Sequence, residues 1–288
     1  MIRAPRLVVT SLVVLFASFV GSTNTLAADA PTDLIARADL AYMSRYVLES
    51  MNDAIALYES VLPDLATLSP GLQAYVLNRL SQLCYEAAMF TEGNVPEDKP
   101  LYTNGKEYGF RSLRLNDEFA AHESDGLKAA LAYVTDPAAL HWTANNWGLL
   151  CGLNPIQGLL EQGSVLALFG RAVELDRDFW GASAASALGS LLIMVPGPMG
   201  GNDAEGLALV EESIVLDPSY LNNRIILAEY WGFTYNMFGA LTGVRDAEMI
   251  ERETTFILES DVGDWPFWNR RAKIDAERLL AQLRDLTD

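Results

Sequence analysis

The sequence predicts an all-α protein of tetratricopeptide-like helical-hairpin repeats, with roughly ten to twelve helices. A pattern of helix, acidic turn and helix occurs twice within residues 165–231, with helix ends at Leu175-Asp176 and Leu216-Asp217. A weaker third instance ends at Leu115-Asn116. Apolar residues recur at helical spacing, and no strand-length stretch alternates with a period of two. Because a single hairpin cannot bury its apolar face alone, we expect a compact or ring-like solenoid.

The first 27 residues predict a secretory signal peptide. Arg3 and Arg6 precede an apolar run over residues 7–21, which is short for a membrane span. Thr25 and Ala27 are small, as the signal peptidase requires, so we expect cleavage after Ala27.

Residues 28–288 are expected to form a single helical-repeat domain in the periplasm. The only two cysteines are Cys84 and Cys151, and none follows the apolar run to accept a lipid. We therefore expect a protein that is not lipidated and has no membrane anchor. In an oxidising compartment the two cysteines could pair, or both could be buried free thiols.

The chain is strongly acidic, with 38 Asp and Glu against 20 Lys and Arg and a net charge of −18. Such a surface repels nucleic-acid phosphates and anionic lipid headgroups, which argues against both partners. The acidity serves solubility or forms an acidic docking face.

Several helix boundaries follow from local signals. Ser69-Pro70, Asp136-Pro137 and Trp265-Pro266 each predict a helix start with proline in the first turn. Asn202 with Glu205 resembles a capping box. The sequence predicts helices over residues 33–62 (a first hairpin), 70–89, 106–115, from 137, 165–175, 180–194, after 202, 220–238, 246–258 and 266–286, with loops over 91–104 and 196–201.

The spacing of the repeats is irregular. Successive helix ends at positions 115, 175 and 216 are 60 and then 41 residues apart. A standard tetratricopeptide repeat is roughly 34 residues long. We therefore expect insertions between the hairpins.

In the order and spacing of its motifs over residues 36–286, the chain resembles the T-component family of tripartite ATP-independent periplasmic (TRAP) transporters. The matching segments are residues 142–148, 171–176, 196–201, 205–207, 216–218, 228–231 and 269–272, followed by Ala276 and Leu279-Leu280. The resemblance implies an accessory subunit that binds a TRAP-type periplasmic solute-binding protein and carries a small apolar or organic-acid ligand. It also implies a homotrimer with a central pore. The absence of a lipid-acceptor cysteine departs from the members that are tethered to the membrane.

Trp142, Asn145, Asn146 and Trp147 lie on one predicted helix and are candidates for lining a ligand site or pore. Indoles mixed with amides suit a mostly apolar pocket that holds a few orienting polar groups. The alternative is that the indoles fill the core and the asparagines bond to the backbone of neighbouring helices.

The loop over residues 196–201 is the second candidate lining segment, through Pro196, Pro198, Met199, Gly200 and Gly201. It lacks the Lys-Ser/Thr of a phosphate-binding loop, which argues against a nucleotide. Its alternative role is a sharp link between helices. Tyr230 and Trp231 belong to an aromatic group too dense for one helix face, so some of these rings must meet a ligand, a neighbouring element or another subunit.

No enzyme motif is present. His122 beside Glu123 and Asp125 could form an acid-base group, but this acidic turn is expected to be solvated. We expect no catalytic residues, no cofactor and no metal, since neither histidine has ligand spacing to another histidine or a cysteine. The alternatives to a transport subunit are a generic periplasmic protein-interaction scaffold with no transporter link, and an unrecognised hydrolase.

Overall fold

A computed structural model describes residues 30–91, 95–236 and 239–287. The expected signal peptide, residues 1–27, lies outside the described residues. Within them the chain forms thirteen α-helices and one sheet of two short strands, so the all-α helical-repeat prediction is confirmed. Both cysteines are free thiols, Cys84 buried and Cys151 half-buried.

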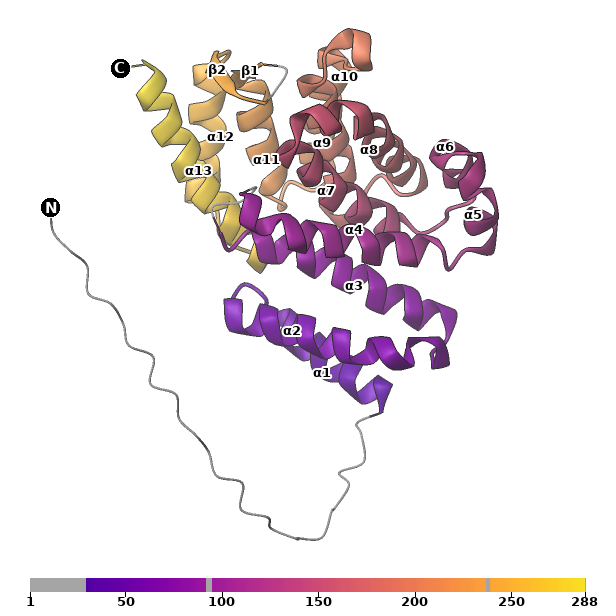
Figure 1. Cartoon of the computed structure of the whole chain (residues 1–288). Helices are drawn as coiled ribbons and strands as arrows, with labels where there is room; N and C mark the ends of the chain where they lie inside the picture. The colour runs from indigo at the N-terminus through magenta and orange to yellow at the C-terminus, as the bar shows by residue number, and fades with distance from the viewer. Residues whose placement is uncertain (1–29, 92–94, 237–238, 288) are drawn as a thin grey trace, which may run out of the picture.

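Pairs of consecutive helices stack on one another through the molecule (Figure 1). The last pair packs beside the first half of the stack, so the two ends of the array lie close together. The pairs are α1 (Pro31–Met43) with α2 (Leu48–Val61), α3 (Pro70–Ala88) with α4 (Lys99–Leu113), α7 (Pro137–Leu153) with α8 (Pro155–Leu175), α9 (Phe179–Met194) with α10 (Asp203–Leu216), and α12 (Ala247–Glu259) with α13 (Pro266–Thr287).

The three helix ends found in the sequence mark the second helix of successive pairs, namely α4, α8 and α10. The acidic residue at two of these ends forms the turn that follows. The Asp176 carboxylate accepts the backbone N–H of Asp178 at 3.1 Å, and that of Asp217 accepts the N–H of Ser219 at 2.9 Å. These side chains take the place of backbone acceptors where the helix stops, which is why Asp recurs there.

An insertion explains the longer first spacing. The short helices α5 (Asp117–His122) and α6 (Leu127–Leu131) lie between the pair α3–α4 and the pair α7–α8. Asn116 caps α5 by accepting the backbone N–H groups of Glu118 and Phe119, both at 3.0 Å. The expected insertion between hairpins is therefore present.

Three boundaries differ from the sequence-based expectation. The loop expected over residues 91–104 ends early, because α4 starts at Lys99 and accommodates Pro100 in its first turn. The helix expected from Val165 starts at Pro155, where Asn154 provides the cap.

In place of the helix expected over residues 220–238, of which 237 and 238 lie outside the described part, the described residues up to 236 form three elements. They are α11 (Asn222–Ile226), the π-helical turn η5 (Leu227–Trp231) and β1 (Phe233–Tyr235), which pairs antiparallel with β2 (Leu241–Val244). Aromatic and β-branched residues in β1 favour a strand, and Gly239 adopts a positive φ of 78° between the strands.

One buried carboxylate joins the two ends of the array. Glu86 on α3 accepts hydrogen bonds from Arg45 Nε at 2.6 Å, Gln82 Nε2 at 2.8 Å and the Trp268 indole at 2.9 Å. Arg45 lies in the turn between α1 and α2, and Trp268 lies on α13. The Glu86 carboxylate on α3 thus connects the first helix pair to the last helix.

Candidate ligand-binding site

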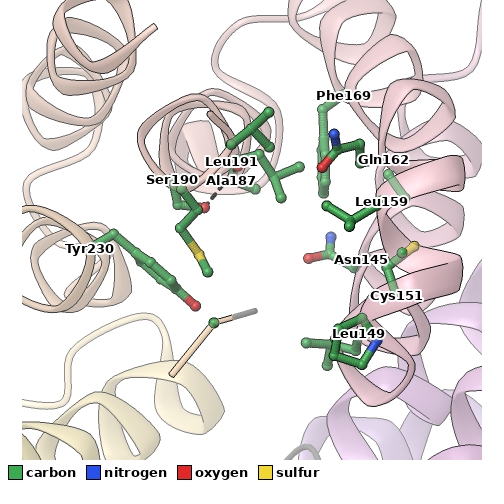
Figure 2. A pocket seen from close by; sticks show the side chains of 18 of the residues that line it. Asn145, Leu149, Cys151, Leu159, Gln162, Phe169, Ala187, Ser190, Leu191 and Tyr230 are labelled. Carbon is green, nitrogen blue, oxygen red and sulfur yellow. Dashed lines mark hydrogen bonds between the residues drawn. The ribbon is translucent and has the colours of Figure 1, made fainter. Parts of the chain in front are cut away.

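A cavity of about 280 Å³ opens between α7, α8 and α9, with Tyr230 of η5 on the opposite side (Figure 2). Its lining is mostly apolar. The lining residues are Tyr85, Ala144, Asn145, Gly148, Leu149, Cys151, Gly152, Pro155, Gly158, Leu159, Gln162, Phe169, Ala187, Ser190, Leu191, Met194, Val195, Pro196, Ile226, Tyr230, Asn236 and Gly239. A mostly apolar cavity with a few polar groups is typical of a site for a small organic molecule.

Helical spacing puts each group of lining residues on one face. On α7, Asn145, Leu149 and Gly152 are four and then three residues apart. Gly158 allows α7 and α8 to approach closely, since a Cβ there would lie 2.6 Å from the carbonyl oxygen of Cys151. The tight α7–α8 corner forms one end of the cavity wall.

Asn145 is the polar group at the centre of the α7 wall. Its Nδ2 donates to the backbone carbonyl of His141 at 2.9 Å and lies 3.0 Å from the His141 Nε2. The same Nε2 lies 3.0 Å from the Ser183 hydroxyl on α9. Burial lowers the pKa of His141 to about 3, so the ring is neutral above that pH.

Tyr230 faces Asn145 from the other side of the cavity, with its hydroxyl directed inward (Figure 2). It belongs to the π-helical turn η5, a kind of turn that occurs frequently at functional sites. Burial, with the neighbouring Glu229 carboxylate, raises the pKa of Tyr230 well above its usual value. The phenol therefore stays protonated and can donate a hydrogen bond.

The described lining holds no charged side chain. Charged residues outside the lining act on it from two sides. Burial and Glu161 raise the pKa of Cys151 to about 11 against the opposing effect of Lys106, and Tyr230 is acted on by Glu229 and, in the opposite direction, by Arg278. Glu161 and Lys106 carry opposite charges, so together they bring no net charge to this edge. Each acidic residue named here is thus opposed by a basic one.

Of the eleven residues proposed from the sequence, the structure places Asn145, Pro196 and Tyr230 in the cavity wall. Trp142 lies in the core, with ring-centroid distances of 4.6 Å to His141 and 5.2 Å to Trp180. It is not among the residues that line the cavity.

Asn146 and Trp147 also lie outside the wall of this cavity. Asn146 is fully buried and donates from Nδ2 to the backbone carbonyls of Trp142 at 2.8 Å and Ser81 at 2.9 Å. Trp147 donates its indole N–H to Glu161 at 2.5 Å, and the Lys106 ammonium lies 3.6 Å from its ring centroid. These contacts tie α7 to α3, α4 and α8.

The remaining proposed residues lie away from the cavity wall. Pro198, Met199 and Gly200 are exposed in the turn between α9 and α10, and Gly201 packs against the backbone of Val195. The Arg245 guanidinium lies 4.4 Å from the ring centroid of Trp231. The structure therefore brings Trp231 to an arginine rather than to the cavity.

The acidic group at His122 has structural partners. The ring of His122 packs edge-on against Tyr133 with centroids 4.4 Å apart, and Glu123 pairs with Arg114 at 2.7 Å. The Arg114 hydrogen bond lowers the pKa of Glu123. Among the described residues no group of three or more His, Cys, Asp or Glu side chains could hold a metal ion.

Sequence reasoning missed the α8 and α9 walls. Leu159 and Gln162 on α8, and Ser190, Leu191 and Met194 on α9, line the cavity. Their spacing of three and four residues is visible in the sequence. The same spacing is found on core faces, so it could not separate a cavity wall from a packed interface.

A family model described as the TRAP transporter T-component matches residues 91–234, half of the chain. The chain belongs to the TRAP transporter T-component family. No curated protein matches the sequence. The matched segment of this T-component runs from the end of α3 into β1 and includes α7, α8, α9 and Tyr230, and hence most of the cavity wall. Members are accessory proteins of transport systems, not known as enzymes.

No helix in the described part of this T-component is long and apolar enough to cross a membrane.

Proposed function

We propose that the protein is a periplasmic accessory subunit of a TRAP-type transport system that binds the solute-binding protein and holds a small apolar or organic-acid ligand in the cavity between α7, α8 and α9. The observation that carries this proposal is that the family match, residues 91–234, contains most of the cavity wall. A cavity of about 280 Å³ without a charged lining suits a small organic molecule better than an ion. The proposal includes removal of residues 1–27, a single domain over residues 28–288 and assembly as a homotrimer.

Exposed apolar residues beside the cavity support a protein partner. Ile156 and Leu160 are 75% and 83% exposed and stand one turn apart on α8, next to the lining residues Pro155 and Leu159. Large apolar side chains this exposed, side by side, mark interaction sites in many proteins. A solute-binding protein seated here would cover the edge of the cavity.

Pull-down with the mature protein from a periplasmic extract tests the partner. We expect mass spectrometry to find a TRAP-type solute-binding protein enriched, and the double variant Ile156→Glu/Leu160→Glu to lose it. The matched control is Val215→Glu on α10, a 78% exposed apolar residue away from the cavity wall. Enrichment of an unrelated partner instead would favour the generic scaffold.

Calorimetric titration with a neutral naphthalene probe tests the cavity. Gln162→Trp should block probe binding by filling the space inside the wall, because Gln162 lines the cavity. Gln157→Trp is the matched control, since Gln157 is exposed on the same helix and does not line the cavity. Equal binding by both variants would show that the probe binds elsewhere.

Removal of the signal peptide and assembly as a homotrimer can each be measured directly. The intact mass of the protein recovered from periplasm should correspond to a chain starting at Ala28. Sedimentation equilibrium should give three times that mass for the homotrimer, and a monomer mass at micromolar concentration would reject it.

A further inference from the structure

The side-chain amide of Asn145 has one allowed orientation. Its Nδ2 lies 2.9 Å from the backbone carbonyl oxygen of His141, an atom that can only accept. The amide nitrogen must therefore face His141, and Oδ1 must face the other way. Figure 2 shows this oxygen turned into the cavity.

The Asn145 oxygen is an open acceptor. It accepts no hydrogen bond from any described residue. It is also not one of the polar side-chain atoms that are buried away from solvent without a partner, so a ligand can reach it. The His141 ring that supports the amide is buried against Trp142, Phe169 and Phe179. Whichever nitrogen of the His141 ring carries the proton, the backbone carbonyl of His141 keeps the amide nitrogen of Asn145 on the His141 side. The amide oxygen therefore faces the cavity with either tautomer.

We propose that the cavity selects a neutral ligand with an apolar body and a hydroxyl or N–H group that donates a hydrogen bond to Oδ1 of Asn145. This inference rests on the proposed ligand function and narrows it. A carboxylate would place its negative oxygens against Oδ1, with no cation in the described lining to compensate. The Tyr230 hydroxyl faces the same space, and it can donate to the oxygen of a ligand hydroxyl.

Three probes of one shape test the inference by calorimetric titration of the mature protein at pH 7. They are 2-naphthol, which donates a hydrogen bond, 2-methoxynaphthalene, which cannot, and 2-naphthoate, which is an anion. We expect 2-naphthol to bind about tenfold more tightly than 2-methoxynaphthalene, because the ether leaves the oxygen of Asn145 without a partner. The carboxylate should bind most weakly.

Two variants test whether Oδ1 of Asn145 causes the preference for 2-naphthol over 2-methoxynaphthalene. Asn145→Leu should equalise the affinities for 2-naphthol and 2-methoxynaphthalene. Tyr230→Phe is the control, since it removes a donor that both probes can use and should weaken both alike. The comparison of probes on the unaltered protein stands even where Asn145→Leu folds poorly.

Equal affinities of the unaltered protein for 2-naphthol and 2-methoxynaphthalene would overturn the inference and leave the proposed ligand function intact. Tightest binding of 2-naphthoate would overturn it in favour of an organic acid. If none of the three probes binds, the ligand function fails and this inference fails with it.

Discussion

His141 should make the stability of the protein depend on pH near neutrality. Burial lowers its pKa from 6.5 to about 3 in the folded protein, and the unfolded chain regains the ordinary value. As pH falls below 6.5, the unfolded state binds a proton that the folded state cannot, so stability is complete above about pH 7 and is lost at lower pH. Linkage between these two pKa values gives a loss of about 2 kcal/mol between pH 7 and pH 5.

Urea denaturation followed by circular dichroism at pH 7, 6 and 5 measures this loss. Because the chain has only two histidines, His122→Gln is a matched control that leaves His141 in place. His141→Phe should remove about 2 kcal/mol of the loss, whatever the carboxylates contribute. Nuclear magnetic resonance of the ring nitrogens offers a direct check. If the ring signal that His141→Phe removes titrates above pH 6 in the folded protein, His141 is not buried as described and its support for Asn145 is lost.

Three further predictions concern stability. Trp147→Ala removes a ring that is 9% exposed, so urea denaturation should show a loss of roughly 3 to 5 kcal/mol while naphthalene affinity is unchanged; weaker binding at full stability would instead place Trp147 at the site. Arg45→Met leaves the Glu86 carboxylate buried without its ion partner and should cost about 3 to 5 kcal/mol, and adding Glu86→Met should recover most of it; an equally unstable double variant would contradict this. Gly201→Ala puts a Cβ 1.6 Å from a backbone oxygen and should lower stability by about 1 to 3 kcal/mol in thermal denaturation, whereas Gly197→Ala, with open space around it, is the control that should stay near wild type.

The helix pairs were predictable because their ends carry local signals. The Leu-Asp ends and the starts at Asp136-Pro137 and Trp265-Pro266 hold in the structure, since capping and the rigid φ of proline act within one turn. The same signal stands at Asn154-Pro155, and it would have given the correct start of α8.

Other parts of the fold have no local signal. Trp180, Gly181 and Ala182 all adopt left-handed backbone conformations, with φ of 53°, 64° and 58°. Two of the three bear side chains, for which this conformation is unfavourable, so only tertiary packing can hold it. It places the Trp180 ring against Trp142 and Trp265, at centroid distances of 5.2 and 5.3 Å.

The ligand site was predictable only in part for a related reason. The sequence indicated a helix bearing both indoles and amides, and Asn145 on that helix does face the cavity. Which neighbours share its face with the cavity depends on where α9 and η5 pack, and these elements come from distant parts of the chain. Trp142 and Asn146, one turn apart, are therefore buried against other helices.

The hydrogen bonds that connect both ends of the array to Glu86 affect how the protein unfolds. In an open array of repeats, the outermost hairpin can melt while the others persist, and such frayed ends are where proteases cut. Here neither the first pair nor α13 can leave without stripping hydrogen bonds from a buried carboxylate. Because Trp268 lies in the first turn of α13, removing its indole should loosen the N-terminal hairpin, far away in sequence. Limited proteolysis of the intact chain should find no early cut in that hairpin.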